Sequence, residues 1–285
     1  MEPTQYQVSD PTPATVLLVD LRNFTPNLNA ADSDDRGVNQ FCHFLSHFYS
    51  LCLDATLIAL PPDCRENAPL YVSSTGDGML GVVHHPEHVR YGFFASIILN
   101  TVLQGICEKY NSSRAASTCP QTSFGIGVEC GDVCRIQAFV APGHAPFVDT
   151  YIGECINVAA RAESMTKLYD RSNTILAAGI NEQLSTLMYG DSYIELIEQA
   201  INDSNTDNER LQAQDRMNEI NRGLCLTFMH HHNLKGVAQP MPLFRLAHGS
   251  VTLGNPRFDS LLKKLAQDEA HLQEVLEFFE KRIHG

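Results

Sequence analysis

The chain has 285 residues, and its 33 acidic and 20 basic side chains give a formal net charge of −13 at pH 7. Nucleic acid and anionic membrane surfaces both require a basic face, so neither is expected as a partner. A small phosphorylated ligand remains compatible with this charge, because a bound cation can neutralise it. The nine cysteines, an odd number spread through core-like segments, are typical of buried reduced thiols.

The start of the chain carries no signal for export. It has no basic stretch followed by an apolar one, and the chain has no run of about 18 apolar residues. We therefore expect a cytoplasmic protein, with residues 1–13 as a mobile arm.

The first strand is predicted at residues 16–20, a continuous apolar run that ends in Asp20 and is typical of a strand covered on both faces. Apolar residues spaced by three and four then predict a helix over residues 38–55. Next, a Gly-Asp-Gly sequence around Asp77 separates two apolar runs, which predicts a β-hairpin. A second helix follows over residues 89–106.

The second half of the chain mixes strands and helices. The elements expected there are strands at 124–129, 133–140 and 147–152, a helix from Glu154, strands at 174–177, 224–229 and 241–246, and an amphipathic helix within 248–285. Residues 192–222 are rich in acidic, Gln and Asn residues, which predicts a solvated helical insert. Helices mixed with antiparallel hairpins favour an α+β fold over a doubly wound sheet.

Two aspartates stand out by their positions. Asp20 ends a buried strand, and Asp77 lies between two glycines that let another group approach closely. If the hairpin pairs beside the first strand, both carboxylates meet at one edge of the sheet. Two like charges this close raise one pKa unless a cation lies between them, and Mg²⁺ prefers carboxylate together with phosphate oxygens. Taken singly, Asp77 also fits a turn-forming role and Asp20 a loop-capping role.

The helix from Glu154 brings two polar side chains to one face. Asn157 and Arg161 are four residues apart, so they lie one helical turn from each other. An arginine of fixed geometry stabilises charge on a phosphoryl group, and an amide orients a sugar oxygen. A plain solvated helix face is the alternative interpretation.

Five motifs occur in order along the chain. They are Val-Asp-Leu-Arg-Asn-Phe-Thr at 19–25, Ser-Thr-Gly-Asp-Gly at 74–78, Gly-Ile-Gly-Val-Glu-Cys-Gly-Asp-Val at 125–133, Gly-x-x-x-Asn-Val-Ala-x-Arg at 153–161 and Leu-Lys-Gly-Val-Ala-Gln-Pro at 234–240. Together they resemble the catalytic domain of the class III nucleotidyl cyclases, the adenylate/guanylate cyclase family. The resemblance implies a ferredoxin-like, palm-related α+β domain over residues 14–247, preceded by the arm 1–13 and followed by the helix within 248–285.

The resemblance also implies a metal and phosphate site. Asp20 and Asp77 would hold two Mg²⁺ or Mn²⁺ ions per site, and the carbonyl of Leu21 would be a further ligand. Backbone N–H groups of the loop after this strand would contact the nucleotide phosphates. The residues of that loop are Asn23, Phe24 and Thr25.

In this family the catalytic domains form a head-to-tail dimer with composite active sites. The resemblance therefore implies a homodimer in which Asn157 and Arg161 of one chain act on the ribose and the transition state at the metals of the other. The reaction is in-line attack of the ribose 3′-OH on the α-phosphorus, with release of pyrophosphate. Metals suit it because they acidify the hydroxyl and stabilise the entering and leaving oxygens.

Two positions bear on the choice of base. Ser73 lies four residues before Asp77, where adenylate cyclases usually have Lys and guanylate cyclases commonly have Glu. Thr150 matches a bacterial subgroup that reads the adenine amino group with a hydroxyl. We expect ATP as substrate first, a pyrimidine triphosphate (UTP or CTP) second and GTP third. Lys235 is either a phosphate contact, as a lysine near this point is in some relatives, or a plain loop residue.

Competing interpretations make different demands on the sequence. A catalytically silent nucleotide-binding or dimerisation module would fit the change at Ser73, but the intact aspartate pair favours an enzyme for intracellular second-messenger signalling. Diguanylate cyclases have the sequence Gly-Gly-Asp/Glu-Glu-Phe at the hairpin, whereas this chain has Thr-Gly-Asp-Gly-Met there.

The three histidines at 230–232 do not indicate a metal site, because three consecutive residues of a strand cannot all face one ion. Cys130 and Cys134 have no second pair at zinc-site spacing.

Overall fold

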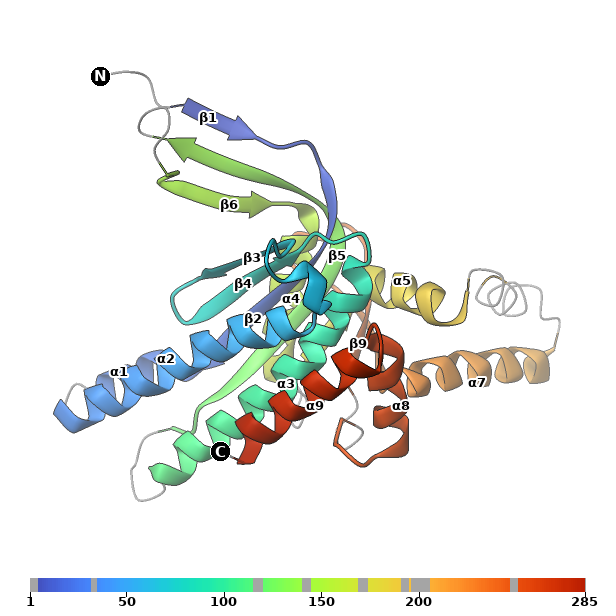
Figure 1. Ribbon diagram of the computed structural model, residues 1–285. Coiled ribbons are helices and arrows are strands. Elements are labelled where there is room, and N and C mark those ends of the chain that lie inside the picture. Colours follow the sequence, from blue (N-terminus) through green and yellow to red (C-terminus); the bar gives the residue numbers. More distant parts are fainter. Residues whose placement is uncertain are drawn as a thin grey trace.

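The computed structural model describes residues 5–31, 35–114, 120–139, 145–168, 174–190, 195, 206–246 and 251–284. These residues form one mixed sheet with helices on both of its faces (Figure 1). The strands are β1 (Gln5–Val8), β2 (Thr12–Arg22), β3 (Leu70–Ser74), β4 (Gly78–Val83), β5 (Ser123–Phe139), β6 (Val148–Ile152), β7 (Thr174–Ala177), β8 (Leu226–His232) and β9 (Met241–Leu246). The helices are α1 (Phe24–Ala31), α2 (Asp35–Ile58), α3 (His88–Ser113), α4 (Glu154–Met165), α5 (Ala178–Tyr189), α7 (Asp207–Gly223), α8 (Pro256–Leu265) and α9 (Glu269–His284), with 3-10 turns η1 (Pro62–Cys64) and η2 (Thr166–Leu168).

The long strands β2 and β5 form the centre of the sheet, whose order is β3-β4-β2-β5-β7-β9-β8. β2 pairs antiparallel with β4 on one side and with β5 on the other, and β5 pairs parallel with β7. The predicted hairpin is present as β3 and β4, joined by the turn that contains Asp77. The α+β class predicted from the sequence is confirmed, and the register sets Asp20 opposite Gly78 and Gly125.

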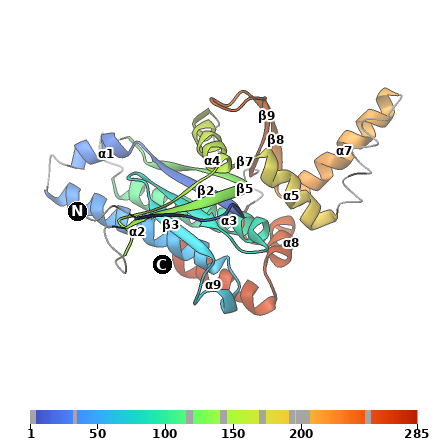
Figure 2. The same ribbon diagram turned by 90° about the horizontal axis from the view of Figure 1, so that it is seen from above.

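Strand β2 is buried on both faces, as its continuous apolar run predicts. Leu17 and Val19 belong to a core cluster with side chains of α2, α3 and α9, whereas Ala14 and Val16 pack with Ala159 of α4. Successive side chains of a strand point to opposite faces. Helix α4 therefore covers one face of the sheet, and α2, α3 and α9 cover the other (Figure 2).

Among the described residues, one helix, α3, is long and apolar enough by length and composition to cross a membrane. In its most apolar window, 67% of the residues are buried inside the structure. The helix packs against β2, β5, α2 and α9. Its apolar side chains therefore form the core of this fold.

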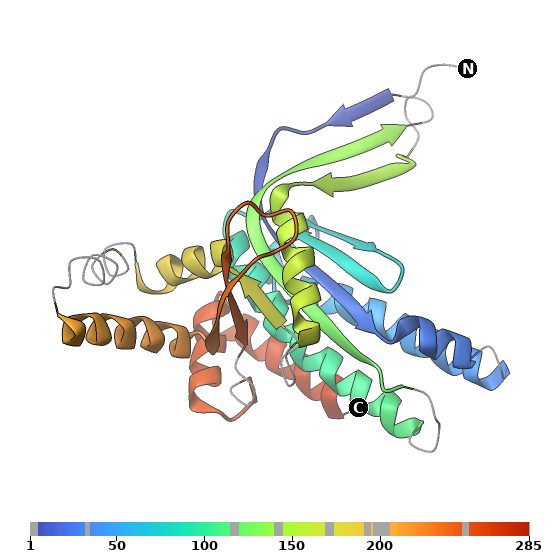
Figure 3. The ribbon, with the colours of Figure 1, turned by 180° about the vertical axis from the view of Figure 1, so that it is seen from behind.

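The region around β5 differs from the predicted elements. The expected arm 1–13 contains strand β1, which pairs with the end of β5, while residues 1–4 lie outside the described residues. Residues 124–129 and 133–140 were expected as two strands, but β5 runs without a break as far as Phe139. It does so because its first half pairs with β2 and β7 while its second half pairs with β1 and β6. This second half extends from the sheet as a three-stranded arm (Figures 1 and 3).

The later segments also differ in part. The C-terminal segment forms two helices instead of one, because the Asp268 carboxylate accepts a hydrogen bond from the His271 N–H at 2.8 Å and starts α9 anew. Of the predicted insert 192–222, residue 195 and residues 206–222 are described. There α7 begins at a capping box formed by Thr206 and Glu209. The rest of the insert lies outside the described residues.

Candidate active site

Asp20 and Asp77 lie at one edge of the sheet. Asp20 pairs with Gly78 across β2 and β4, and the Leu21 N–H donates to the carbonyl oxygen of Asp77 at 2.9 Å. A side chain at position 78 would overlap the carbonyl oxygen of Val19, so glycine is required for the turn to lie this close to β2. The turn thus brings the second carboxylate beside the first, and both remain partly exposed.

Asp20 has both a negative charge and positive charges near its carboxylate. Burial and then the negative charge of Asp77 raise the pKa of Asp20, while Arg22 and Lys167 lower it in part. The Nη1 atom of Arg22 lies 3.5 Å from Oδ2 of Asp20, and Nζ of Lys167 lies 4.0 Å from the same oxygen. The repulsion between the two carboxylates therefore marks this edge as a place where a further positive charge is favourable.

The donor set at this edge fits Mg²⁺ or Mn²⁺. The side-chain donors are two carboxylates, and the carbonyl of Leu21 follows Asp20 directly. Within the described residues, no group of three or more His, Cys, Asp or Glu side chains converges on one point. A magnesium ion held by one or two carboxylates completes its shell with water and substrate phosphate oxygens, so a two-carboxylate edge suits it.

The loop after β2 leads directly into helix α1. Asn23 has φ of 58°, a left-handed conformation in which Asn is the best tolerated residue after Gly. Its side-chain amide donates to the carbonyl oxygen of Gln121 at 2.8 Å and so connects the loop after β2 to the segment before β5. The backbone N–H groups of Phe24 and Thr25 lie in the first turn of α1, where N–H groups have no partner within the helix and suit an anion.

Asn157 and Arg161 lie on the outer face of α4, one turn apart, and both are exposed. The inner face of α4 packs on β5 at Gly127, where a Cβ atom would overlap the carbonyl oxygen of Ala159. In the part of the chain that the structure describes, the ion pairs of Asp20 involve Arg22 and Lys167, and none joins it to Arg161. The structure thus brings the two aspartates together but leaves this pair facing away from the sheet.

Ser73 and Thr150 lie on neighbouring elements and are half-buried. Ser73 is on β3 and Thr150 on β6, and the Tyr71 hydroxyl bridges these strands by donating to the carbonyl oxygen of Asp149 at 2.5 Å. The Tyr71 and Tyr151 rings also touch, with centroids 5.0 Å apart. Among the described residues, the hydrogen bond and the ring contact that join β3 to β6 thus come from Tyr71, Tyr151 and the Asp149 backbone.

Lys235 is exposed in the turn between β8 and β9. Its neighbour Leu234 is buried in a cluster with Val158 and Ala162, so the turn packs against α4. Of the three histidines, His230 has φ of 73° at an irregularity of β8, and the His232 ring bonds to the carbonyl oxygen of Met229 at 2.7 Å.

Sequence reasoning missed a charged cluster beside Asp20. The guanidinium of Arg22 forms an ion pair with Glu163 at 2.7 Å, and its Nη2 atom also donates to the Thr166 hydroxyl. Burial raises the pKa of Glu163, and the charge of Arg22 opposes that shift. Arg22 and Glu163 are 141 residues apart, and no local pattern in the sequence indicates that they meet.

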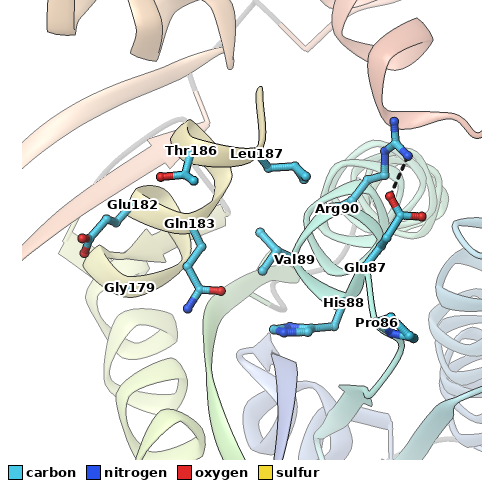
Figure 4. Close-up of a pocket in the computed structure, with 10 residues that line it drawn as sticks. All are labelled: Pro86, Glu87, His88, Val89, Arg90, Gly179, Glu182, Gln183, Thr186 and Leu187. Carbon is cyan, nitrogen blue, oxygen red and sulfur yellow. Dashed lines mark hydrogen bonds and ion pairs between the residues drawn. The ribbon is translucent and has the colours of Figure 1, made fainter. Parts of the chain in front are cut away.

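A separate cavity of about 500 Å³ lies between the N-terminal end of α3 and helix α5 (Figure 4). Arg90 and Glu87 form an ion pair at its edge, with 2.9 Å between Nη1 and Oε1. None of the site residues named above lines this cavity. It is therefore distinct from the aspartate edge.

No protein-family model and no curated protein matches this chain. Solved structures do match. The guanylyl cyclase Cya2 is 14% identical over 85% of this chain and 95% of its own, with a TM-score of 0.52. A bacterial light-regulated adenylyl cyclase is 12% identical over 98% of this chain and 59% of its own, with a TM-score of 0.51. The adenylyl cyclase CyaB from P. aeruginosa is 12% identical over 87% and 97%, with a TM-score of 0.50. The chain therefore has the fold of class III adenylate/guanylate cyclase catalytic domains.

Proposed function

We propose that the protein is a nucleotidyl cyclase, which converts a nucleoside triphosphate into a 3′,5′-cyclic nucleotide and pyrophosphate. The observation that carries this proposal is the pair Asp20 and Asp77, brought together at one sheet edge of a cyclase fold and next to the N-terminus of α1. In the reaction the ribose 3′-oxygen forms a bond to the α-phosphorus. The bond from that phosphorus to the oxygen bridging to the β-phosphate breaks, and the hydroxyl proton leaves to solvent.

Different residues of the chain bind the metal ions and the phosphates. Asp20, Asp77 and the carbonyl of Leu21 hold two Mg²⁺ or Mn²⁺ ions, which acidify the hydroxyl and offset charge on the phosphates when bound. The N–H groups of Phe24 and Thr25 bind phosphate oxygens at the positive end of α1. Lys235 adds a second positive contact to the phosphates.

Asn157 and Arg161 orient the ribose and stabilise the transition state in a site on a second copy of the chain. Their exposure on the outer face of α4, without an ion pair to Asp20 among the described residues, supports this arrangement. A two-fold dimer repeats its contacts, so two equivalent sites form. The assembly is a homodimer, and the activity serves second-messenger signalling in the cytoplasm.

ATP is the favoured substrate, followed by UTP or CTP and then GTP. The hydroxyl of Thr150, a half-buried residue, supports adenine, whereas Ser73 replaces both the Lys usual for adenine and the Glu common for guanine. A site built to hydrogen-bond one base edge rejects a base without the matching groups by roughly 10⁴-fold. The choice of base therefore depends on the side chains of Ser73 and Thr150.

The decisive experiment incubates the purified chain with each of the four ribonucleoside triphosphates and Mn²⁺ and identifies products by mass spectrometry. We expect a cyclic nucleotide from ATP, and its loss in Asp20→Asn and in Asp77→Asn. The two variants keep the size of the side chain, so a lost product with an unchanged circular dichroism spectrum points to the carboxylates. Nucleotide binding without any cyclic product would instead support a silent binding module.

A further inference from the structure

Arg22 joins β2 to the C-terminal end of α4. Its Nη2 atom lies 2.7 Å from Oε1 of Glu163, and it donates to the carbonyl oxygen of Glu163 at 3.3 Å and to the hydroxyl of Thr166. Both charged side chains are nearly buried, with exposed fractions of 13% for Arg22 and 8% for Glu163. The ion pair with the Glu163 carboxylate and the two hydrogen bonds together fix the orientation of the guanidinium.

Gly125 of β5 makes room for this contact. A Cβ atom at this position would overlap Nη2 of Arg22, the Thr166 hydroxyl and the Glu163 carboxylate. Gly125 also lies opposite Asp20 in the register of β2 and β5. The pair of Arg22 and Glu163 therefore crosses the surface of the sheet directly beside Asp20.

The other terminal nitrogen of Arg22 faces Asp20 without binding it. Nη1 lies 3.5 Å from Oδ2 of Asp20, which is close enough for an ion pair and too long for a normal hydrogen bond. Within the described residues, Nη1 is buried and has no hydrogen-bond partner. Arginine usually meets a carboxylate through two parallel hydrogen bonds, and Arg22 does not do so here.

We propose that Glu163 and Arg22 position the Asp20 carboxylate for a divalent cation. Glu163 holds the guanidinium of Arg22 back, so the Asp20 oxygens remain open to the ion. The inference rests on the proposed metal site. In the position that the ion pair with Glu163 sets, Arg22 still offsets part of the repulsion between Asp20 and Asp77 before the ion binds. Both residues act through Asp20 and need not touch the nucleotide, so they are positioning residues.

Removing the charge of Glu163 removes the ion pair that draws Arg22 away from Asp20 and leaves only the hydrogen bonds to the Glu163 carbonyl oxygen and the Thr166 hydroxyl. The guanidinium then closes onto Asp20, because its fork matches a carboxylate with two hydrogen bonds. The cation has to displace this pair before it reaches the oxygens. One charge-assisted hydrogen bond corresponds to a change of roughly tenfold in an equilibrium constant, which is the expected weakening of cation binding.

The test measures Mn²⁺ binding to the full chain by electron paramagnetic resonance, without nucleotide. We expect Glu163→Gln to raise the Kd for Mn²⁺ about tenfold. The double variant Glu163→Gln with Arg22→Gln should return to near the wild-type Kd, because the competing guanidinium is gone. If this double variant does not fold, Arg22→Lys in the Glu163→Gln background replaces it, since Lys keeps the charge but lacks the fork. Glu154→Gln is the matched control, a carboxylate at the exposed start of the same helix.

The outcomes separate this inference from the proposed function. A wild-type Kd in Glu163→Gln overturns the positioning role, and so does a double variant as weak as Glu163→Gln alone. Either result leaves the metal site standing. If Mn²⁺ binds the wild type no better than a variant with Asp20→Asn and Asp77→Asn, the metal site itself fails, and the inference fails with it.

Discussion

Helix α4 crosses β5 at Gly127, and replacing this glycine with alanine tests whether the crossing positions the candidate catalytic groups. The added Cβ atom would overlap the carbonyl oxygen of Ala159 and crowd the N–H of Glu163. Both are backbone atoms, which cannot rotate away as the end of a side chain can. Helix α4 must therefore shift away from the sheet to accommodate the methyl group.

The size of the effect follows from this overlap. Overpacking costs about 1–3 kcal/mol of unfolding free energy, and 1 kcal/mol corresponds to about 2–4 °C in Tm for a large domain. We expect the Tm to fall by about 2–12 °C. The shift also carries Asn157 and Arg161 with the helix. A misplacement on the order of 1 Å reduces turnover up to about 100-fold.

Thermal unfolding by circular dichroism and cyclic nucleotide formation measure the two effects in one buffer. Gly105→Ala is the matched control, since Gly105 lies within α3 and has open space at its Cβ position. Alanine there should raise the stability by about 0.5–1 kcal/mol and leave turnover unchanged. A Gly127→Ala variant with the Tm and turnover of the wild type would refute the reasoning, because α4 would then accept a methyl group without moving.

Equal amounts of an Asp20→Asn chain and an Arg161→Ala chain should regain about a quarter of wild-type activity, because half of the dimers are mixed and each has one complete site. No recovery after demonstrated subunit exchange would exclude shared sites. Burial raises the pKa of Glu129 above 4.5, so its contribution to stability is full below about pH 4.5 and is lost as pH rises through the folded pKa. Glu129→Gln should abolish this dependence in denaturant unfolding, and an unchanged pH profile would contradict it. Asn23→Ala should cost about 1–2 kcal/mol at its left-handed φ and Asn23→Gly less, whereas equal losses would assign the effect to the hydrogen bond with Gln121.

Local patterns in the sequence predict the centre of the fold and the aspartate edge. The apolar run that ends in Asp20 and the glycines around Asp77 each act within a few residues, so the hairpin beside β2 follows from them. Strand β1 has no such pattern, since Gln5–Val8 becomes a strand through pairing with residues 136–139. The continuity of β5 likewise depends on partners at both of its ends, which the local pattern that predicted separate strands at 124–129 and 133–140 does not reveal.

The charged cluster beside Asp20 lies beyond sequence reasoning for the same reason. Arg22 and Glu163 are 141 residues apart, and their contact exists because Gly125 and Gly127 let α4 lie close to β5. Glycines in a strand point to close backbone approach, but they do not identify which side chains then meet. The pair of tyrosines that joins β3 to β6 is similar, since neither Tyr71 nor Tyr151 belongs to a motif.

If both proposals hold, the two faces of α4 serve different active sites of the dimer. Dimers formed from two different variants distinguish these two roles. Glu163 on the inner face serves the metal site of its own chain, whereas Arg161 on the outer face serves the site of the other copy. At low Mn²⁺, a Glu163→Gln chain mixed with an Arg161→Ala chain collects both lesions in one site and leaves the other complete, so activity should recover. Mixed with an Asp20→Asn chain, it leaves each site with one damaged metal edge, and activity should stay low. Low activity with both mixtures would assign Glu163 to a general structural role, because the Arg161→Ala chain can complement only a defect that is confined to the metal site of the Glu163→Gln chain.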